Sequence, residues 1–584
     1  LRKPCQKKAS PAQSRGPLAE IFRNRTEKRR MKKNILTTLI LLFSFQLIFS
    51  QEKLTENQKL TSLCKVWGFL KYYHPNVAKG TINWDKELIE KIKELKEVNT
   101  KNELNKTYLN WLNKLGDFPK CETCELKTDI EYFDKNFDLN WTDNKSTFSE
   151  ELIEKLNYIE QNRNQGINHY VKLDENFKIQ IQNEQEYSIS FPEKEYRLLE
   201  LFKYWNIIEY FFPYKYQTDQ NWNDVLEEMI PKFFNSTDIT TYHLSILELV
   251  TKIDDSHAKF KSSEILKNFG VLKIPIQCEL LENKLIIARI LNQDIAEKEN
   301  IKVGDIIEEI NGKTIEEIIT ELSKYIPASN KSVKIRNLIR DNYFIRGTKN
   351  SLQLKINRDG NIFEKQINLY SFKEINYDYK KNINSESKKW EILEGNIGFV
   401  NIGLLTKEDV ETMFAEFKDT KAIIFDYRHY PKRTGHKIND FIASKPTVFW
   451  SKISQDLSYP GKFIWKRNLK SGKFNEANYK EKILILVNEN SQSQSEFATM
   501  ILQSNPNVKT IGSQTSGADG DICKIKIAGI ETVFSGLGVF YPDDTETQRK
   551  GVKIDIEVKP TINGLKENKD EVLERAIEYI NSGK

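Results

Sequence analysis

Residues 483–521 read ILILVNENSQSQSEFATMILQSNPNVKTIGSQTSGADGD, and this stretch decides the fold. The first five residues are apolar and rich in β-branched side chains, which predicts a buried strand. From Glu496 onward the apolar residues recur with helical spacing, and an acid in the first turn favours a helix start there. A further apolar run at 508–511 predicts another strand. The pattern is typical of an α/β fold with a serine-rich turn between a strand and a helix N-terminus.

A serine in such a turn has two possible roles. Unpaired backbone N–H groups and the helix dipole favour negative charge at this point. A hydroxyl held there can attack a carbonyl while the amides stabilise the oxyanion. Alternatively, Ser491, Ser493 and Ser495 only cap the helix. The turn taken alone favours capping.

The turn also matches a known catalytic element. Residues 493–496, SQSE, resemble the S-x-S-E element of peptidase family S41, the tail-specific or C-terminal processing proteases. The resemblance covers most of the chain from about residue 198 onward. It implies that Ser493 is the nucleophile and that the amide of Gln494 lines the oxyanion hole. It also implies a crotonase- or ClpP-like α/β core at 385–584, with no metal or other cofactor.

A second element supplies a candidate base. Residues 254–258 read DDSHA and resemble the D-S-H element of the tricorn-type branch of the same family. There the histidine is the general base and the preceding serine orients it, which implies these roles for His257 and Ser256. A serine hydroxyl is a weak nucleophile until a neighbour takes its proton. A polar turn that ends a helix is the alternative interpretation, and sequence separation is no objection because triads assemble in space.

The core departs from the family pattern at two places that concern the base and the oxyanion. Residues 422–431, AIIFDYRHYP, resemble the I-x-D-x-R element, but Tyr430 and Pro431 stand where the family has glycines. Proline has no N–H, so Tyr430 and Gln494 are the oxyanion candidates. Ala518 occupies the lysine position of the Ser-Lys branch, which favours His257 as base. A Ser-Lys protease that uses the out-of-register Lys524 is a third hypothesis.

The fourth member of the tricorn-type tetrad is also altered. The family places a glutamate shortly before the C-terminal G-x-x-x-D strand, which here begins at Gly551. Strict register gives Gln548, and the nearest acid is Glu546, which we therefore predict for this role. Together with Tyr430 and Pro431, Gln548 motivates an alternative function. In that alternative the chain is a catalytically impaired relative that binds peptides without cleaving them.

A small β domain is expected at 269–375. Residues 301–313, IKVGDIIEEINGK, resemble the GD-I-x-x-I-N-G element of a PDZ domain. Such domains bind extended C-terminal peptides by strand addition. The usual carboxylate-binding loop is not legible before Ile274, so a spacer or lid is an equal alternative.

The N-terminal region carries an internal duplication. Trp67 is followed by Trp84, and Trp205 by Trp222, at a constant offset of 138 residues. Each copy reads as an aromatic helix stopped by proline, a loop and a second amphipathic helix. We therefore expect a duplicated helical hairpin, divided between a mixed domain at 51–195 and a helical segment at 196–268. His74 aligns with a phenylalanine of the second copy, which favours a packing role.

The first 50 residues carry the chain's positive charge. Residues 1–30 are basic and aperiodic, and we expect them to be translated upstream sequence. Residues 31–50 have the charged start and apolar run of a signal peptide. The alternative is a basic tail before a membrane anchor. The formal charge of +6 becomes negative after residue 50, with 77 basic and 81 acidic side chains. Neither a nucleic-acid partner nor a membrane span after cleavage is therefore expected.

Cys121 and Cys124 form an isolated C-x-x-C on a polar stretch. A local disulfide is the favoured interpretation, since export permits disulfides. A zinc site would need two more ligands, and a redox motif would need a βαβ context.

These observations together predict an exported serine endopeptidase, located in the bacterial periplasm or outside the cell. It would cleave peptides or unfolded C-terminal protein segments through an acyl-enzyme on Ser493. Its partners would be peptide or protein substrates, with a C-terminal peptide at the PDZ-like domain.

Overall fold

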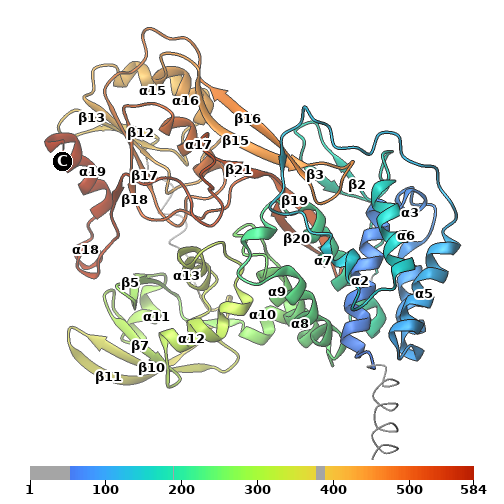
Figure 1. Ribbon diagram of the computed structural model, residues 1–584. Coiled ribbons are helices and arrows are strands. Elements are labelled where there is room, and N and C mark those ends of the chain that lie inside the picture. The colour runs from blue at the N-terminus through green and yellow to red at the C-terminus, as the bar shows by residue number, and fades with distance from the viewer. Residues whose placement is uncertain (1–52, 188–189, 376–387, 584) are drawn as a thin grey trace, which may run out of the picture.

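The computed structural model describes residues 53–187, 190–375 and 388–583. The predicted upstream segment and signal peptide lie outside the described residues. The chain forms a mixed α/β structure with three parts, shown in Figure 1: a core sheet with its helices, an insert below it and a block of helices to one side.

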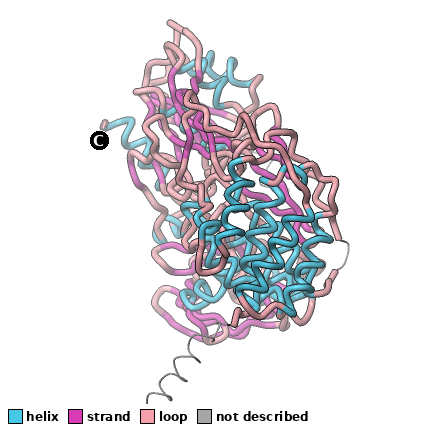
Figure 2. The backbone as a smooth tube through the Cα atoms, turned by 45° about the vertical axis from the view of Figure 1, so that its right-hand side comes forward, coloured by secondary structure: helices cyan, strands magenta, loops and turns pink. Residues whose placement is uncertain are grey.

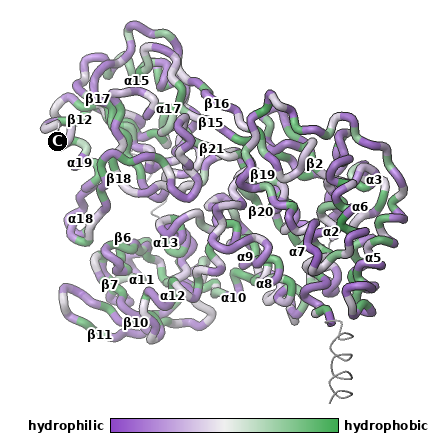
Figure 3. Tube along the Cα trace, in the orientation of Figure 1, coloured by the Kyte–Doolittle hydropathy of each residue, from purple (hydrophilic) through white to green (hydrophobic). Residues whose placement is uncertain are grey.

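The core is a mainly parallel sheet covered on both faces. Its strand order is β12 (Trp390–Leu393), β13 (Ile397–Asn401), β14 (Ala422–Asp426), β17 (Lys482–Val487), β18 (Val508–Gly512) and β22 (Ile556–Glu557). Only β12 runs antiparallel to its neighbour. β14 is apolar from Ala422 to Phe425 and β17 from Ile483 to Val487, as expected for strands whose two faces are both buried. Hydropathy along the chain can be followed in Figure 3.

Helices pack on the sheet according to the alternation of its side chains. Ile483, Ile485 and Val487 face one cluster, whereas Leu484 and Leu486 face the other. The first face is covered by α15 (Asp409–Phe417), α16 (Gly435–Ile442) and α17 (Gln494–Gln503). The second is covered by α19 (Glu571–Ser582), which follows the short α18 (Ile562–Lys566). The predicted strand, turn and helix of residues 483–503 are therefore present.

The insert has its own sheet and its own apolar cluster. The strand order is β11 (Asn361–Asn368), β10 (Ser351–Arg358), β7 (Ile306–Ile310), β6 (Lys284–Ile290) and β5 (Ile276–Leu281), with β8 (Lys313–Thr314) paired to β7. Its helices are α11 (Gln293–Lys298), α12 (Ile315–Leu322) and α13 (Lys331–Arg340), and β4 (Leu272–Lys273) pairs with β9 (Arg346–Gly347). β5 lies at an edge of this sheet beside α13.

The N-terminal region is mostly helical and forms the block of helices in Figure 2. Its first helices are α2 (Glu56–Tyr73), α3 (Pro75–Ala78), α4 (Trp84–Glu94), α5 (Lys101–Lys114) and α6 (Glu150–Gln161). The short hairpin of β2 (Val171–Leu173) and β3 (Ile179–Ile181) follows. The later helices are α7 (Lys194–Phe211), α8 (Trp222–Phe234), α9 (Ile239–Thr251) and α10 (Ser263–Phe269).

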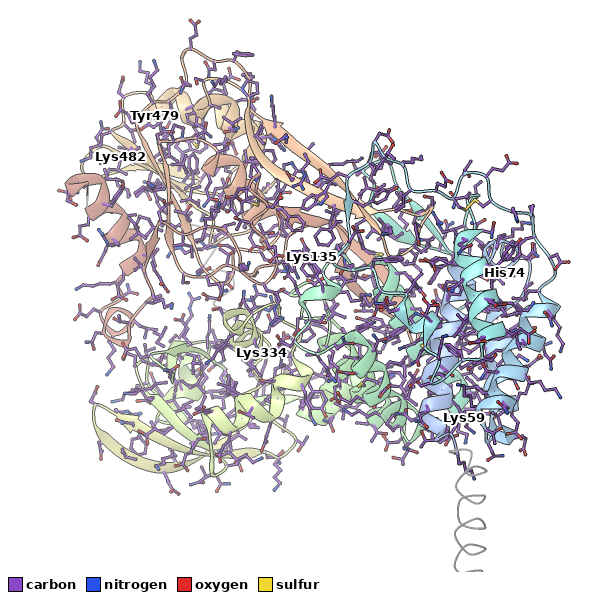
Figure 4. All side chains as sticks on the ribbon, viewed as in Figure 1. Lys59, His74, Lys135, Lys334, Tyr479 and Lys482 are labelled. Atoms are coloured by element: carbon purple, nitrogen blue, oxygen red, sulfur yellow. A yellow bond between two sulfur atoms is a disulfide. The ribbon has the colours of Figure 1, made fainter. Side chains whose placement is uncertain are left out.

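The repeated tryptophans form the same structure twice. Trp67 and Trp84 each donate an indole N–H to the other's carbonyl, both at 3.0 Å. Trp205 and Trp222 do the same at 2.8 and 3.1 Å. His74 is buried against Phe118, and burial lowers the pKa of His74 to about 4. It packs in the helical block, far from Tyr479 and Lys482 of the core (Figure 4).

Two hairpins of the core reach into the helical block. β15 (Thr447–Gln455) and β16 (Phe463–Ser471) pair with β21 (Gly538–Phe540) and with the N-terminal β1 (Tyr132–Phe133). The Gln455 amide donates to the Phe211 carbonyl at 2.7 Å. β19 (Ile522–Ile527) and β20 (Ile530–Ser535) place Cys523, Ile525 and Phe534 in the apolar cluster of the helices. The β19–β20 hairpin therefore contributes to the apolar interior of the helical block, whereas the core sheet has clusters of its own.

Cys121 and Cys124 are bonded as a disulfide, which confirms the predicted local bridge. Among the helices that the structure describes, none has the length and hydropathy needed to cross a membrane.

The contact between α2 and α7 generates a stability prediction. Gly68 faces Asn206 so closely that a Cβ at residue 68 would lie 1.7 Å from the Asn206 Oδ1. We expect Gly68→Ala to lower the free energy of unfolding by about 1–3 kcal/mol, because the two helices must separate. Urea unfolding measures this. Gly166→Ala is the matched control, since its nearest neighbour would be 3.6 Å away. Equal stability of the two variants would contradict the close packing.

Candidate active site

Ser493 lies at a strained turn between β17 and α17. Its backbone has φ 55° and ψ −114°, a conformation that residues other than glycine rarely adopt. Such a conformation costs on the order of 1–3 kcal/mol and persists only when the surroundings impose it. A strained strand-to-helix turn is the device that exposes a nucleophilic hydroxyl in other hydrolases.

The buried carboxylate of Glu496 imposes this conformation. It accepts the Ser493 N–H at 3.1 Å, and that N–H also donates to the Ala518 carbonyl at 3.1 Å. Glu496 further accepts the Gly517 N–H at 2.7 Å, the Ala518 N–H at 3.1 Å and the Thr515 hydroxyl at 2.6 Å. Burial raises the pKa of Glu496, and these donors oppose that rise. Glu496 thus fastens the turn that carries Ser493 to the loop at 515–519.

The neighbouring serines support the turn rather than cap α17. The Ser491 hydroxyl donates to the Tyr427 carbonyl at 2.9 Å, and the Ser495 hydroxyl donates to the His429 carbonyl at 3.4 Å. Both carbonyls belong to the loop that follows β14. The turn is therefore held against the next strand of the sheet.

His257 is buried and held through one ring nitrogen. Its Nδ1 lies 2.9 Å from the Ser535 Oγ and 3.4 Å from the Asp255 Oδ1. Asp255 also accepts the N–H groups of Ser535 at 2.6 Å and His257 at 3.0 Å. Since an ionised carboxylate only accepts, Nδ1 carries the proton and Nε2 keeps its lone pair. Nε2 is buried and makes no hydrogen bond within the part of the chain described.

Asp255 also sets the pKa of His257. Burial lowers this pKa, but the hydrogen bond and charge of Asp255 outweigh burial, and the charges of Asp519 and Glu496 add to them. The pKa of His257 is therefore raised above its usual value. The pKa of Asp255 moves the other way. Burial raises it, but the hydrogen bonds from His257 and Ser535 outweigh burial, so the pKa of Asp255 lies below its usual value.

Ser256 has a different place from the one predicted. Its hydroxyl donates to the Ser516 carbonyl at 3.2 Å and accepts the Ser329 N–H at 2.9 Å. The Ser329 hydroxyl in turn accepts the Ser256 N–H at 2.8 Å. Ser256 therefore joins two loops, and Asp255 and Ser535 orient the imidazole instead. The i, i+2 spacing of Asp255 and His257 was the available signal.

The structure brings the two predicted loops together. The Gln492 side chain donates to the Ser256 carbonyl at 3.2 Å, so the residues adjoining Ser493 and His257 are in direct contact. The loop at 515–519 closes the arrangement, because Ser516 donates its N–H to the Ser491 carbonyl at 2.9 Å. The turn that carries Ser493, the loop at 254–258 that carries His257 and the loop at 515–519 form one cluster.

Glu546 lies among other partners. Its carboxylate accepts from Tyr216 at 2.9 Å, from Lys135 at 3.2 Å and from Lys550 at 3.1 Å. Lys135 is labelled in Figure 4, where the core meets the helical block. No described contact joins Glu546 to Ser493 or His257, so the structure gives it no tetrad role.

Gln548 and Asp519, unlike Glu546, have buried polar atoms without partners. Both amide atoms of Gln548 and the Asp519 Oδ2 are buried without a hydrogen-bond partner among the described residues. Asp519 follows Ala518, whose carbonyl holds the Ser493 N–H. Burial and the charge of Glu496 raise the pKa of Asp519 to about 8. Buried polar atoms without partners are uncommon and concentrate at functional sites. A single sequence gave no signal for Asp519.

Of the two oxyanion candidates, Gln494 lies at the start of α17 and Tyr430 lies on the loop after β14. Gln494 is the first residue of the helix, where an N–H has no intrahelical acceptor. Tyr430 follows His429, whose carbonyl meets Ser495, and the Tyr430 side chain is 61% exposed. Lys524 lies elsewhere: it pairs with Glu531 on the β19–β20 hairpin at 3.3 Å.

The insert takes part in the site through α13. Arg336 donates to the Glu489 carbonyl at 2.6 Å, to the Ser516 hydroxyl at 2.8 Å and to the Gln492 Oε1 at 3.0 Å. Asn330 donates to the carbonyls of Thr515 and Ser516 at 2.9 and 3.2 Å. Within the described ranges, no group of three His, Cys, Asp or Glu side chains is arranged to hold a metal ion.

Residues 396–558 match the sequence profile of Peptidase family S41. The catalytic core belongs to peptidase family S41. The protein is accordingly a serine-type peptidase, a hydrolase. No curated protein matches the chain.

Solved structures share the fold of this S41 protein. Mature CPAF complexed with lactacystin is 14% identical, with 66% of this chain and 99% of that chain covered and a TM-score of 0.52. Mature CPAF alone is 13% identical, with 67% and 99% covered and a TM-score of 0.50. At these identities the likeness is one of fold.

Asp519 generates a pH prediction. With a pKa of about 8 it is neutral at pH 7, and its ionisation adds a charge beside Glu496 and His257. Peptidase activity should fall as pH rises through about 8. Asp519→Asn is neutral at every pH. This variant should keep its activity near pH 7 and should not show the fall in activity above pH 8.

Stability provides an independent measurement on the same variant. The folded pKa of Asp519 exceeds the ordinary 3.8. The stability that protonated Asp519 contributes is therefore fully present below pH 3.8 and is lost as the pH rises through about 8. Urea unfolding at pH 5 and pH 8 should differ less in Asp519→Asn than in the parent. An unchanged alkaline limb and unchanged stability would contradict the assignment.

Proposed function

We propose that this S41 protein is an exported serine endopeptidase that acts through an acyl-enzyme on Ser493, with His257 as general base. One observation carries the proposal. A serine held in a strained, partly exposed turn lies in the same loop cluster as a histidine whose Nδ1 is fixed and whose Nε2 is unpartnered.

In the first step Ser493 Oγ attacks the carbonyl carbon of the scissile peptide bond, and His257 Nε2 takes the hydroxyl proton. The new C–O bond makes a tetrahedral oxyanion. The N–H of Gln494, at the positive end of α17, donates to that oxygen, and the amide of Tyr430 is the second candidate donor. Asp255 stabilises the imidazolium that forms.

In the second step the C–N bond breaks, and His257 returns its proton to the leaving amine. Water then attacks the Ser493 ester while His257 again accepts a proton. The carboxylic acid leaves, and the serine hydroxyl is restored. Asp255 and Ser535 act as positioning residues, since they contact the imidazole and not the substrate.

The substrate proposal rests on the insert. Its edge strand β5 beside α13 is an arrangement in which an extended peptide could add as a further strand. Together with the GD-I-x-x-I-N-G element, this supports a PDZ-like module that receives the C-terminal segment of an unfolded protein. The parallel sheet carrying the nucleophile at a strand-to-helix turn supports a crotonase- or ClpP-like core.

Export is supported by the signal-peptide pattern at 31–50 and by the disulfide between Cys121 and Cys124, because disulfides persist in oxidising compartments. We propose the bacterial periplasm or the cell exterior as its location.

Alternatively, the protein binds peptides without cleaving them. Pro431 and Gln548, which depart from the family pattern, suggest this alternative. A fluorophosphonate probe separates the two. We expect stoichiometric labelling at Ser493, and loss of both labelling and peptide hydrolysis in Ser493→Ala, by at least about 10³-fold. Ser236→Ala is the control. Folded protein without labelling would support the binder and refute the peptidase.

The contact between Asp255 and His257 generates a further prediction. Its removal lowers the pKa of His257, so the acidic limb of kcat/KM should move to lower pH in Asp255→Asn. The rate should fall by about 10²–10⁴-fold, because the imidazole loses its fixed tautomer. A pH profile measures both effects. Asp294→Asn, on the exposed side of α11, is the charge-matched control. A limb that does not move would remove Asp255 from the site.

A further inference from the structure

Two lysines face each other on the hairpin of β15 and β16. Lys452 of β15 and Lys466 of β16 are direct partners across the antiparallel ladder. Like charges in this position repel and destabilise a sheet. Both side chains are half-buried, so solvent screens the repulsion less than at a fully exposed position. An anion that contacts both ammonium groups would remove this cost.

The surrounding carboxylates leave this pair without a close counter-ion. The Lys452 ammonium donates to the Asn176 carbonyl at 3.3 Å. In the described part of the chain, neither Lys452 nor Lys466 forms an ion pair with a carboxylate. Asp521 and Asp174 attract Lys452 only at longer range, and Asp174 has a lysine of its own at 3.5 Å. The two ammonium groups therefore outnumber the acid that remains, which is the exposed Asp521.

Lys466 has only an aromatic neighbour for its charge. Its ammonium lies over the ring of Phe177, a side chain that is 46% exposed. An aromatic face attracts a cation less strongly than a carboxylate does. Burial and the charge of Lys452 lower the pKa of Lys466. The position therefore favours an anionic ligand over the present neighbours.

Two aromatic rings connect the lysine pair with the nucleophile. The Lys452 ammonium lies 5.6 Å from the centre of the Trp450 ring, and that ring lies 5.0 Å from the Phe497 ring. Phe497 follows Ser493 by one turn of α17, so the two side chains lie on the same side of the helix. Ser493, Phe497, Trp450 and Lys452 are all partly exposed. They form a continuous path along which a peptide bound at Ser493 can extend.

The chain that carries the base support leads to the same place. Ser535, which contacts His257, is followed four residues later by Val539 of β21. Val539 is the ladder partner of Lys452. Figure 1 shows β15, β16 and β21 side by side, next to α17. The lysine pair is therefore adjacent to both halves of the site.

We propose that Lys452 and Lys466 bind a carboxylate of the peptide substrate, and so favour substrates with a negative charge a few residues from the cleaved bond. An extended peptide advances about 3.3 Å per residue, so this carboxylate lies roughly three to five residues from the scissile bond. An acidic side chain and a C-terminal carboxylate share the required chemistry. This inference rests on the proposed peptidase function.

Matched peptides test the proposal. A set of uncharged peptides, blocked at both ends, first shows by mass spectrometry which bond is cleaved. Glu or Gln is then placed three to five residues to either side of that bond. We expect kcat/KM to be about tenfold higher for Glu than for Gln at one of these positions. The preference should shrink in about 0.5 M salt. Peptides with a free acid or an amide at the C-terminus distinguish the two sources of the carboxylate.

The variants are compared by this Glu-to-Gln ratio, which does not depend on the fraction of folded enzyme. The ratio should fall to about one in Lys452→Gln and in Lys466→Gln, whereas Lys452→Arg should keep it because the charge is retained. Lys470→Gln, an exposed position on the same strand β16, is the charge-matched control and should keep the ratio of the parent.

The same peptides separate this proposal from the peptidase function. Equal rates for all charged and neutral pairs in an active parent, or a preference that survives the loss of both lysines, would overturn the lysine proposal alone. If the folded parent cleaves no peptide, the peptidase function fails. The affinities of Ser493→Ala for the same Glu and Gln peptides then decide the lysine proposal by the same ratio.

Discussion

The contact on which the catalytic arrangement depends is the one between the Glu496 carboxylate and the backbone of two loops. Ser493 adopts a backbone conformation that an isolated chain avoids, and the cost must be met by its surroundings. Glu496 meets it by accepting the N–H groups of Ser493, Gly517 and Ala518. A buried carboxylate with several donors is fixed in orientation, and so is every group that donates to it.

The same loops are held from two further directions, which explains why the chain needs its other parts. Arg336 of the insert donates to the Glu489 carbonyl and to Ser516, and Ser329 bonds Ser256 of the 254–258 loop. From the helical block, α9 leads directly into the 254–258 loop, and β20 carries Ser535 to the His257 imidazole. The insert and the helices are therefore parts of the support of the Ser493 and His257 loops.

Local patterns predicted the local structures well. The apolar run at 483–487 and the spacing after Glu496 gave the strand, the turn and the helix, because burial on both sheet faces and a helical period leave clear marks. The meeting of the loops bearing Ser493 and His257 was likewise predicted, from family resemblance. What one sequence could not reveal were side-chain partners far apart in the chain. Ser256 was expected to orient His257, yet Ser535, on a hairpin near the C-terminus, does so. Nothing local distinguishes these serines.

Three buried acids lie near His257, and their charges limit how many of them can ionise. Asp255, Glu496 and Asp519 are all buried, and the charge of each raises the pKa of His257. Three adjacent carboxylates cannot all ionise at modest cost. The fold leaves Asp255 charged against the imidazole and keeps Asp519 protonated near neutral pH. Gln548 is buried at the position where the family resemblance predicts a glutamate. A neutral amide there adds no further buried negative charge to a fold that already holds three buried acids near His257.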